Sequence, residues 1–208
     1  ADAGHYFQQS AGMIADARKK GAKLVVMDPR LSNSAGIADL WVPVWPGTEA
    51  ALYLHLTSRI LNEKSIDGKD LVKHDFVKNW VNWDRLMKDK KYLQFMLDKG
   101  YIQSLPKGES YEDFIEMIKG LYAPYTLEFA AKECRVEPYK LEKLFEYLIE
   151  AGDKIATYIW RAGPIGHRGG WMNARSAFLP LVLRGALACL LYTSPSPRDR
   201  TRARMPSS

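Results

Sequence analysis

Residues 21–49 read GAKLVVMDPRLSNSAGIADLWVPVWPGTE, and this stretch decides the fold. It contains two short apolar runs, residues 24–27 and 40–45, which are rich in β-branched or aromatic residues and end in turn residues. Buried strands of a parallel sheet have this pattern. Because ligands of open α/β sheets bind at the carboxyl ends of the strands, the residues that follow each run are candidates for a binding site.

An acidic residue follows each apolar run. Asp28 comes directly after the first run and is followed by Pro29 and Arg30, and the second run ends in PGTE at residues 46–49. A carboxylate in this place can accept hydrogen bonds from the ribose or the base of a nucleotide. The alternative interpretation is that Asp28 caps a turn and that Arg30 is a solvated charge.

The same series of residues resembles the molybdopterin oxidoreductase superfamily, the dimethyl sulfoxide reductase type. KLVVMDPR at 23–30 and AGIADLWVPVWPGTEAAL at 35–52 follow the family's pattern in order and at its spacing. Glu49 stands where Asp is commoner in the family, so the acid is kept and its reach is longer by one methylene. YTLEFAAKECRVEPYKLEKLFEYL at 125–148 also follows the family closely. The resemblance covers about residues 1–64 and 123–188.

Members of this family carry molybdenum or tungsten on two pterin guanine dinucleotides. The resemblance implies that the two acid-containing segments bind the guanosine end of one dinucleotide, and that the glycine-rich loop at 161–170 approaches the pterin. A plain surface turn is the alternative for this loop. The residues implied to bind cofactor are Asp28, Pro29, Arg30, Gly47, Thr48, Glu49, Ala162, Gly163, Gly166 and His167.

The resemblance implies two-electron redox chemistry at the metal. The metal's protein ligand lies upstream in family members, so no catalytic residue and no metal ligand is named in this chain. The resemblance also implies an iron–sulfur cluster elsewhere in the full-length chain, and Cys134 and Cys189 cannot hold one by themselves. The expected partners are the remainder of the same polypeptide and an electron-transfer subunit.

Composition limits the other partners. The net charge is +6, but residues 189–208 hold four Arg and one Asp, so half of that charge lies in the tail. The remainder is too diffuse for a nucleic-acid surface. No apolar run reaches the length of about 18 residues that a membrane helix needs, so no membrane insertion is expected. The first residues lack the pattern of a signal peptide, and the compartment is not predicted.

The expected fold class is α/β, with a Rossmann-like parallel sheet, flanking helices and an all-helical insertion. Residues 1–64 form the first part of the core, residues 65–122 the insertion and residues 123–188 the second part. Aromatic residues interleaved with Lys in the insertion could indicate single-stranded nucleic-acid binding, but their helical spacing favours a core role. The predicted strands are residues 23–27, 40–44 and 154–159; the predicted helices include residues 10–20, 48–62 with Thr48 as N-cap, 173–188, and two that begin at Thr126 and Pro138.

Residues 189–208 read CLLYTSPSPRDRTRARMPSS and break the helical pattern before them. Codons for residues 189–199 can be chosen to spell a common transposase-based sequencing adapter, and the end of the chain fits its continuation with one base changed. We therefore interpret the segment as a non-native tail derived from an adapter. An unrelated disordered tail rich in Pro, Ser and Arg is the alternative.

Two other functions compete with the oxidoreductase. One is a non-catalytic relative that keeps the fold, like the large iron–sulfur subunit of NADH dehydrogenases; the retained Asp28 and the Gly47-Thr48-Glu49 sequence argue against it. The other is an unrelated nucleotide-binding module such as half of a dehydrogenase. The absence of a GxGxxG sequence after the first strand argues against that module.

Overall fold

The computed structural model describes residues 8–157, 159 and 169–186 of the chain. The predicted cofactor-binding residues Ala162, Gly163, Gly166 and His167 and the predicted tail at 189–208 lie outside these residues. The elements in chain order are α2 (Gln8–Lys19), β1 (Val25–Met27), α3 (Asn33–Gly36), β2 (Leu40–Val42), α4 (Glu49–Asn62), α5 (His74–Trp80), α6 (Trp83–Lys88), α7 (Lys90–Asp98), α8 (Tyr111–Tyr122), α9 (Leu127–Cys134), α10 (Pro138–Ala151), α12 (Gly170–Ser176) and α13 (Leu179–Leu183).

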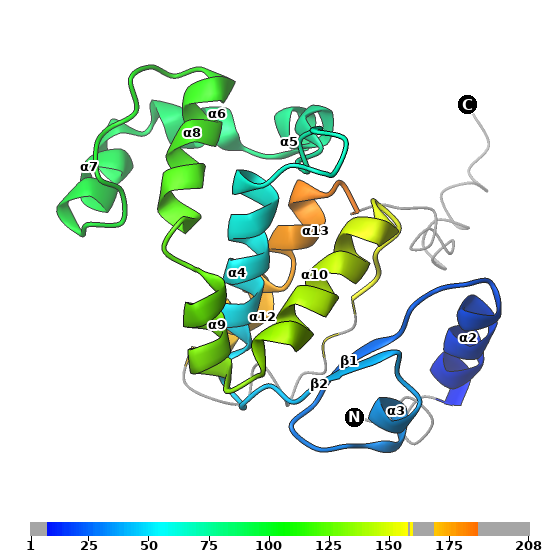
Figure 1. The fold of residues 1–208 in the computed structure, drawn as a ribbon. Coiled ribbons are helices and arrows are strands. Elements are labelled where there is room, and N and C mark those ends of the chain that lie inside the picture. The colour runs from blue at the N-terminus through cyan, green and yellow to red at the C-terminus, as the bar shows by residue number, and fades with distance from the viewer. Residues whose placement is uncertain (1–7, 158, 160–168, 187–208) are drawn as a thin grey trace, which may run out of the picture.

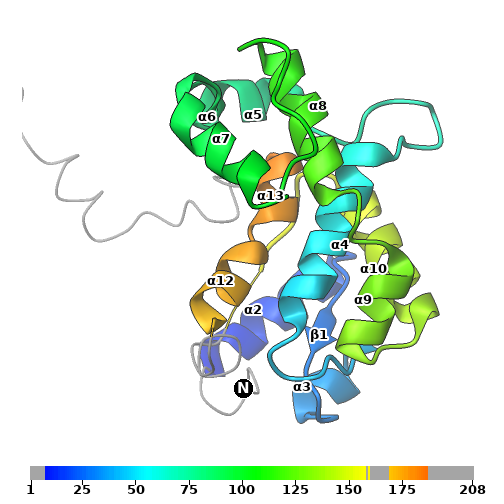
Figure 2. The same ribbon diagram turned by 90° about the vertical axis from the view of Figure 1, so that its left-hand side faces the viewer.

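Helix α4 runs through the centre of the molecule. Helices α9 and α10 lie on one side of it and α12 and α13 on the other, while α8 packs along its upper part (Figures 1 and 2). Its apolar stripe of Leu52, Leu56 and Ile60, spaced four residues apart, is at most 2% exposed. This spacing places the three side chains on one face of a helix, as the sequence predicts.

Strands β1 and β2 pair in parallel, with Val25 opposite Leu40 and Met27 opposite Val42. Asp39 fixes the start of the pair, because its carboxylate accepts the N–H of Leu24 at 2.8 Å and faces Arg18 Nε at 3.5 Å. The hydrogen bond from Leu24 lowers the pKa of Asp39. The first two predicted strands are therefore confirmed, each shorter than expected.

The third predicted strand is wrong for the described residues. Residues 154–157 and 159 belong to no strand, and the described sheet has two strands, so a Rossmann-like sheet is not confirmed. An apolar run can satisfy a core without joining a ladder, because a strand also needs a neighbour with a matching row of backbone groups. The fold is instead mostly helical with a small parallel sheet.

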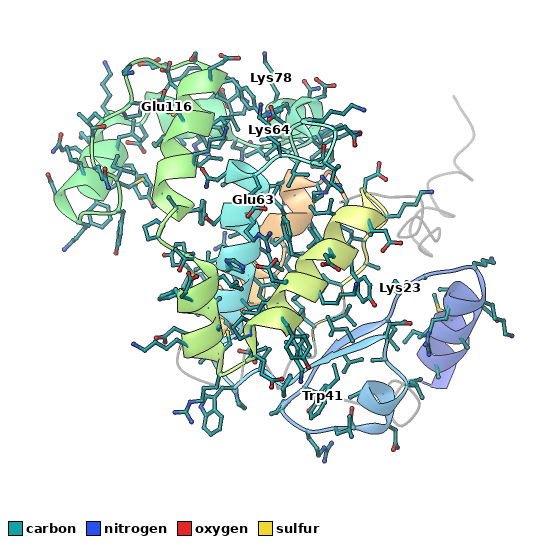
Figure 3. The ribbon with its side chains drawn as sticks, viewed as in Figure 1. Lys23, Trp41, Glu63, Lys64, Lys78 and Glu116 are labelled. Atoms are coloured by element: carbon teal, nitrogen blue, oxygen red, sulfur yellow. The ribbon has the colours of Figure 1, made fainter. Side chains whose placement is uncertain are left out.

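Helices α5 to α8 lie within residues 65–122, where short helices are predicted, and the side chains of Asp89 and Ser110 cap α7 and α8. Ser110 starts α8 with a capping box: its hydroxyl accepts the N–H of Asp113 at 3.1 Å and the Asp113 carboxylate accepts the N–H of Ser110. Charged side chains such as Lys78 and Glu116 face outward from this part (Figure 3). Among the described helices, none is long and apolar enough to cross a membrane.

The predicted closing helix at 173–188 is interrupted. Helix α12 ends at Ser176, and α13 begins at Leu179 with Pro180 in its first turn. Proline has no N–H and its ring clashes with the carbonyl four residues earlier, so one continuous helix cannot pass through Pro180. The starts predicted at Thr126 and Pro138 are confirmed, since Thr126 Oγ1 accepts the N–H of Phe129 and Pro138 is the first residue of α10.

The end of α13 joins three parts of the chain. The Arg184 guanidinium donates to the carbonyls of Leu71 at 2.6 Å and Gly152 at 3.2 Å, and the carbonyl of Leu183 accepts the N–H of Lys73. Gly185 follows with a φ of +67°. This glycine therefore sits where the chain must turn close against the start of α5.

We expect Gly185→Ala to lower the free energy of unfolding more than Gly100→Ala. Both glycines have a left-handed φ, +67° and +71°, which costs an alanine about 1–2 kcal/mol. At Gly185 a Cβ would also meet Lys73 Cγ at 3.0 Å, whereas at Gly100 it would meet nothing within 4 Å. Urea unfolding of the two variants should differ by about 1 kcal/mol or more; equal losses would contradict the close contact.

Candidate functional site

The carboxyl edge of the β1–β2 pair brings the two predicted acidic segments to the same end of the sheet. Parallel strands end on the same side, and the N–H of Asp28 donates to the carbonyl of Val42 at 3.3 Å. The indole N–H of Trp41 donates to the carbonyl of Asp28 at 2.7 Å. This hydrogen bond holds the turn after β1 against β2, so the two segments emerge from the same edge.

Asp28 closes the turn that follows β1. Its Oδ1 accepts the N–H of Arg30 at 2.9 Å, the side-chain-to-backbone bond typical of an Asx turn. Asp28 is half-buried, whereas Pro29 and Arg30 are exposed. The turn-capping role considered for Asp28 is thus present in this structure, and the exposed Arg30 guanidinium is available to an anion.

The turn at Gly47 leads into α4 through a left-handed glycine, with a φ of +89°. The N–H of Gly47 donates to Glu49 Oε2 at 3.0 Å, so the acid folds back over the turn. Thr48 is the N-cap residue, but the predicted side-chain cap is wrong: its hydroxyl donates to the carbonyl of Trp45 at 2.7 Å. With ψ near 3° rather than extended, Thr48 has a backbone unlike that of a usual N-cap residue.

Tyr53 and Cys134 surround the base of this turn. The Tyr53 hydroxyl lies 3.5 Å from Met27 Sδ, which brings the second turn of α4 beside the end of β1. The Cys134 thiol donates to the carbonyl of Thr48 at 3.2 Å. Burial, with a smaller effect of nearby Glu49, raises the pKa of Tyr53 well above its usual range, and burial raises the pKa of Cys134. Both groups are therefore neutral at physiological pH.

Sequence reasoning missed Asn173 at this site. Its Nδ2 donates to Glu49 Oε2 at 2.5 Å, across 124 residues of sequence. Asn173 lies on α12, is 4% exposed, and its Oδ1 has no hydrogen-bond partner among the described residues. No local pattern marks an asparagine for such a contact, because the contact exists only once α12 has packed on α4.

No model of a known protein family matches the chain. Over 84 residues it is 39% identical to acetylene hydratase of Syntrophotalea acetylenica, a match that covers 40% of this chain and 10% of that protein. Over 169 residues it is 26% identical to the dimethyl sulfoxide reductase DmsA of Escherichia coli K12, covering 81% of this chain and 18% of that protein.

A solved structure, acetylene hydratase from Pelobacter acetylenicus, matches with a TM-score of 0.60 over 88% of this chain and 20% of that one, at 21% identity. This likeness shows a shared fold. Together, these similarities indicate the molybdopterin oxidoreductase superfamily, dimethyl sulfoxide reductase type. The chain spans about a fifth or less of the length of these relatives. The family resemblance that the sequence predicts is thereby confirmed.

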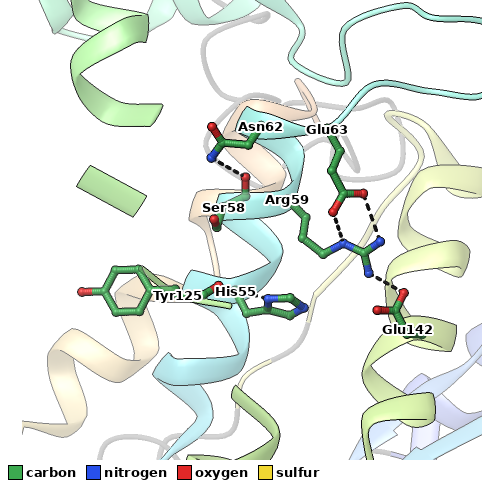
Figure 4. A network of polar contacts seen from close by, with 7 residues as sticks. All are labelled: His55, Ser58, Arg59, Asn62, Glu63, Tyr125 and Glu142. Carbon is green, nitrogen blue, oxygen red and sulfur yellow. Dashed lines mark hydrogen bonds and ion pairs between the residues drawn. The ribbon is translucent and has the colours of Figure 1, made fainter. Parts of the chain in front are cut away.

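A second polar cluster of this chain lies on the far part of α4 (Figure 4). Arg59 binds the Glu63 carboxylate with two hydrogen bonds, at 2.6 and 3.0 Å, and Glu142 of α10 with one at 2.6 Å. Its guanidinium also lies 3.7 Å from the ring centre of Phe145. The cluster ties α4 to α10 and borders a pocket of about 260 Å³.

His55 lies one turn before Arg59 and is 2% exposed. Its Nδ1 is 3.1 Å from the carbonyl of Tyr125, so Nδ1 carries the proton and donates (Figure 4). Nε2 is buried and has no hydrogen-bond partner among the described residues. In the described parts of the chain, no group of His, Cys, Asp and Glu side chains could hold a metal ion. The cluster is therefore a structural tie between helices.

The stability of the fold should decrease at acidic pH because of His55. Burial, with a smaller effect of Arg59, lowers the pKa of His55 from its usual 6.5, although the Tyr125 carbonyl opposes this. As the pH falls below about 6.5, the unfolded chain takes up this proton before the folded chain does, so the free energy of unfolding decreases. Above that pH, the contribution of neutral His55 to stability is fully present.

His55→Asn removes this titration and keeps an N–H that can reach the Tyr125 carbonyl. We expect the variant to lose less stability between pH 7 and pH 5 than the wild-type chain, measured as the urea midpoint at each pH. A variant whose midpoint falls as steeply as that of the wild type would show that another group causes the acid sensitivity.

Proposed function

We propose that this chain provides part of the binding site for a molybdopterin guanine dinucleotide in a molybdenum- or tungsten-dependent oxidoreductase. One observation carries the proposal: the parallel β1–β2 pair delivers Asp28 and the Gly47–Glu49 turn to the same edge of the sheet. Ligands of α/β proteins bind at this edge. The similarity to the molybdopterin oxidoreductase superfamily supports the identity of the ligand.

The residues at this edge fit a ligand that carries N–H donors. Guanine presents adjacent N–H groups on one edge, and a carboxylate offers a pair of acceptor oxygens for them. Asp28 and Glu49 provide these carboxylates, and Glu49 is held in place by the Asn173 amide. The site is thus rich in acceptors, as a guanine requires.

The anionic part of the dinucleotide needs positive charge. Arg30 is exposed beside Asp28 and can pair with a pyrophosphate, for which a guanidinium is well suited. Helix α4 begins at Glu49 and directs its free N–H groups toward the same edge. For Ala162, Gly163, Gly166 and His167, an approach to the pterin stays a prediction.

When bound, the cofactor's metal supplies two-electron redox chemistry. The metal ligand, the iron–sulfur cluster and any electron-transfer subunit are proposed to lie outside this chain. The relatives found are named as enzymes, a hydratase and a reductase, which supports an enzyme over the non-catalytic relative. The chain's own part is to bind and orient the nucleotide end of the cofactor.

Replacing Asp28 in the full-length enzyme tests the proposal. Asp28→Asn keeps an oxygen for the N–H of Arg30, and so keeps the turn, but sets amide N–H groups against the donors of guanine. We expect a loss of about 1–3 kcal/mol in nucleotide binding, roughly fivefold to 150-fold. The amount of guanine nucleotide that acid releases from the enzyme and the metal content of the enzyme should decrease together. The thermal unfolding midpoint should change little.

Asp98→Ala is the matched control, because this exposed carboxylate on α7 contacts only its neighbour Gln94 among the described residues. Its nucleotide and metal content should equal those of the wild type. Asp28→Ala, which also removes the cap of the turn, should lose nucleotide to at least the same extent. A well-folded Asp28→Asn enzyme with normal nucleotide and metal content would overturn the assignment and leave Asp28 with its turn-capping role.

A further inference from the structure

Asn173 lies on the helix that follows one predicted cofactor-binding segment and contacts a residue of another. Helix α12 begins at Gly170, the last residue of the predicted glycine-rich loop at 161–170, and the Asn173 amide reaches Glu49 at the start of α4. Figure 2 shows α12 lying alongside α4. The hydrogen bond of 2.5 Å therefore couples an element behind one predicted binding segment to a carboxylate within the other.

The orientation of the Asn173 amide is fixed by charge. Glu49 Oε2 already accepts the N–H of Gly47 at 3.0 Å, and it accepts a second donor from Asn173. Turning the amide over would place its oxygen 2.5 Å from a carboxylate oxygen, and two acceptors at that distance repel. The Nδ2 group must therefore face Glu49, and Oδ1 must face the other way.

This orientation leaves Oδ1 buried without a donor in the described part of the chain. Buried polar atoms are almost always hydrogen-bonded, and an unpaired one costs stability. An apolar residue of similar size would avoid that cost and still pack α12 against α4. The position instead holds an amide, which suits a role in holding Glu49.

We propose that Asn173 is a positioning residue that sets the orientation of Glu49 for binding the nucleotide end of the cofactor. This inference rests on the proposed function. Nδ2 and the N–H of Gly47 together hold Oε2 on one side of the carboxylate. The direction in which the acid can reach is thereby fixed, although Glu49 is longer by one methylene than the aspartate that is commoner in the family.

The neighbours of Glu49 make this neutral donor important. Tyr53 on its own helix and Cys134 on α9 are ionisable groups near Glu49, and burial keeps both uncharged. Arg175 on α12 is exposed and lies over the ring of Trp171. Among the described residues, the bonded partners of Oε2 are thus uncharged N–H groups, and one of the two comes from Asn173.

Asn173→Asp tests the inference in the full-length holoenzyme. The substitution keeps the shape of the side chain but places a second carboxylate against Glu49. At pH 8.5 both are ionised and repel, whereas at pH 5.5 a shared proton can restore the hydrogen bond. We expect the variant to retain about tenfold less guanine nucleotide after dialysis at pH 8.5 than at pH 5.5, while the wild type shows no such ratio.

Asn173→Ala separates positioning from packing. It removes the donor without adding charge, so it should lose nucleotide faster than the wild type to the same extent at both pH values. If Asn173 only packs the helix, the Asp and Ala variants will show no difference in their pH dependence, and the inference falls. If Asn173→Asp fails to fold, nucleotide release from Asn173→Ala decides: release about tenfold faster than in the wild type supports the role, and equal release overturns it.

Asp28→Asn keeps this test distinct from that of the proposed function. Loss of nucleotide from Asp28→Asn together with full retention by Asn173→Asp at both pH values would leave the cofactor site in place and remove the role of Asn173. Full retention by both variants would overturn the cofactor site and the inference with it.

Discussion

Helix α4 is buried around most of its circumference, and its polar side chains must therefore find partners inside the protein. Leu52, Leu56 and Ile60 fill one face, but His55 and Thr57 are also at most 2% exposed. Thr57 returns its hydroxyl to the carbonyl of Tyr53, and His55 bonds the carbonyl of Tyr125. Burial of polar groups without such partners is costly. The surrounding helices are held at positions where these bonds can form.

The same constraint fixes the candidate site, because the site is the first turn of this central helix. The carbonyl of Thr48 receives the Cys134 thiol, the N–H of Trp45 donates to the carbonyl of Cys134, and Glu49 is bound by Asn173. Residues of α9 and α12 thus form hydrogen bonds to this turn. A binding residue on such a turn is held by core packing rather than by a free loop, which favours precise placement of a ligand.

Local signals in the sequence predict the first half of the site and not the second. Asp28 and Gly47 follow short apolar runs and stand next to turn residues, so their place at the end of strands can be read from neighbours in the chain. Asn173 acquires its role through a contact across 124 residues, for which no local signal exists. The prediction of the third strand is wrong because apolar composition does not specify a pairing partner. The sequence does contain the signal that divides the last helix, because Pro180 prevents one continuous helix.

The order of synthesis gives the central position of α4 a further consequence. Its residues are made before those of α12 and α13, which cover one side of it and begin more than a hundred residues later. At about 5–20 residues per second, the ribosome needs roughly 5–20 s to supply that distance. Until then the apolar stripe of α4 lacks its contacts with α12 and α13, and long-range contacts of this kind form slowly. A nascent chain paused in this interval exposes a hydrophobic helix to chaperones and to aggregation.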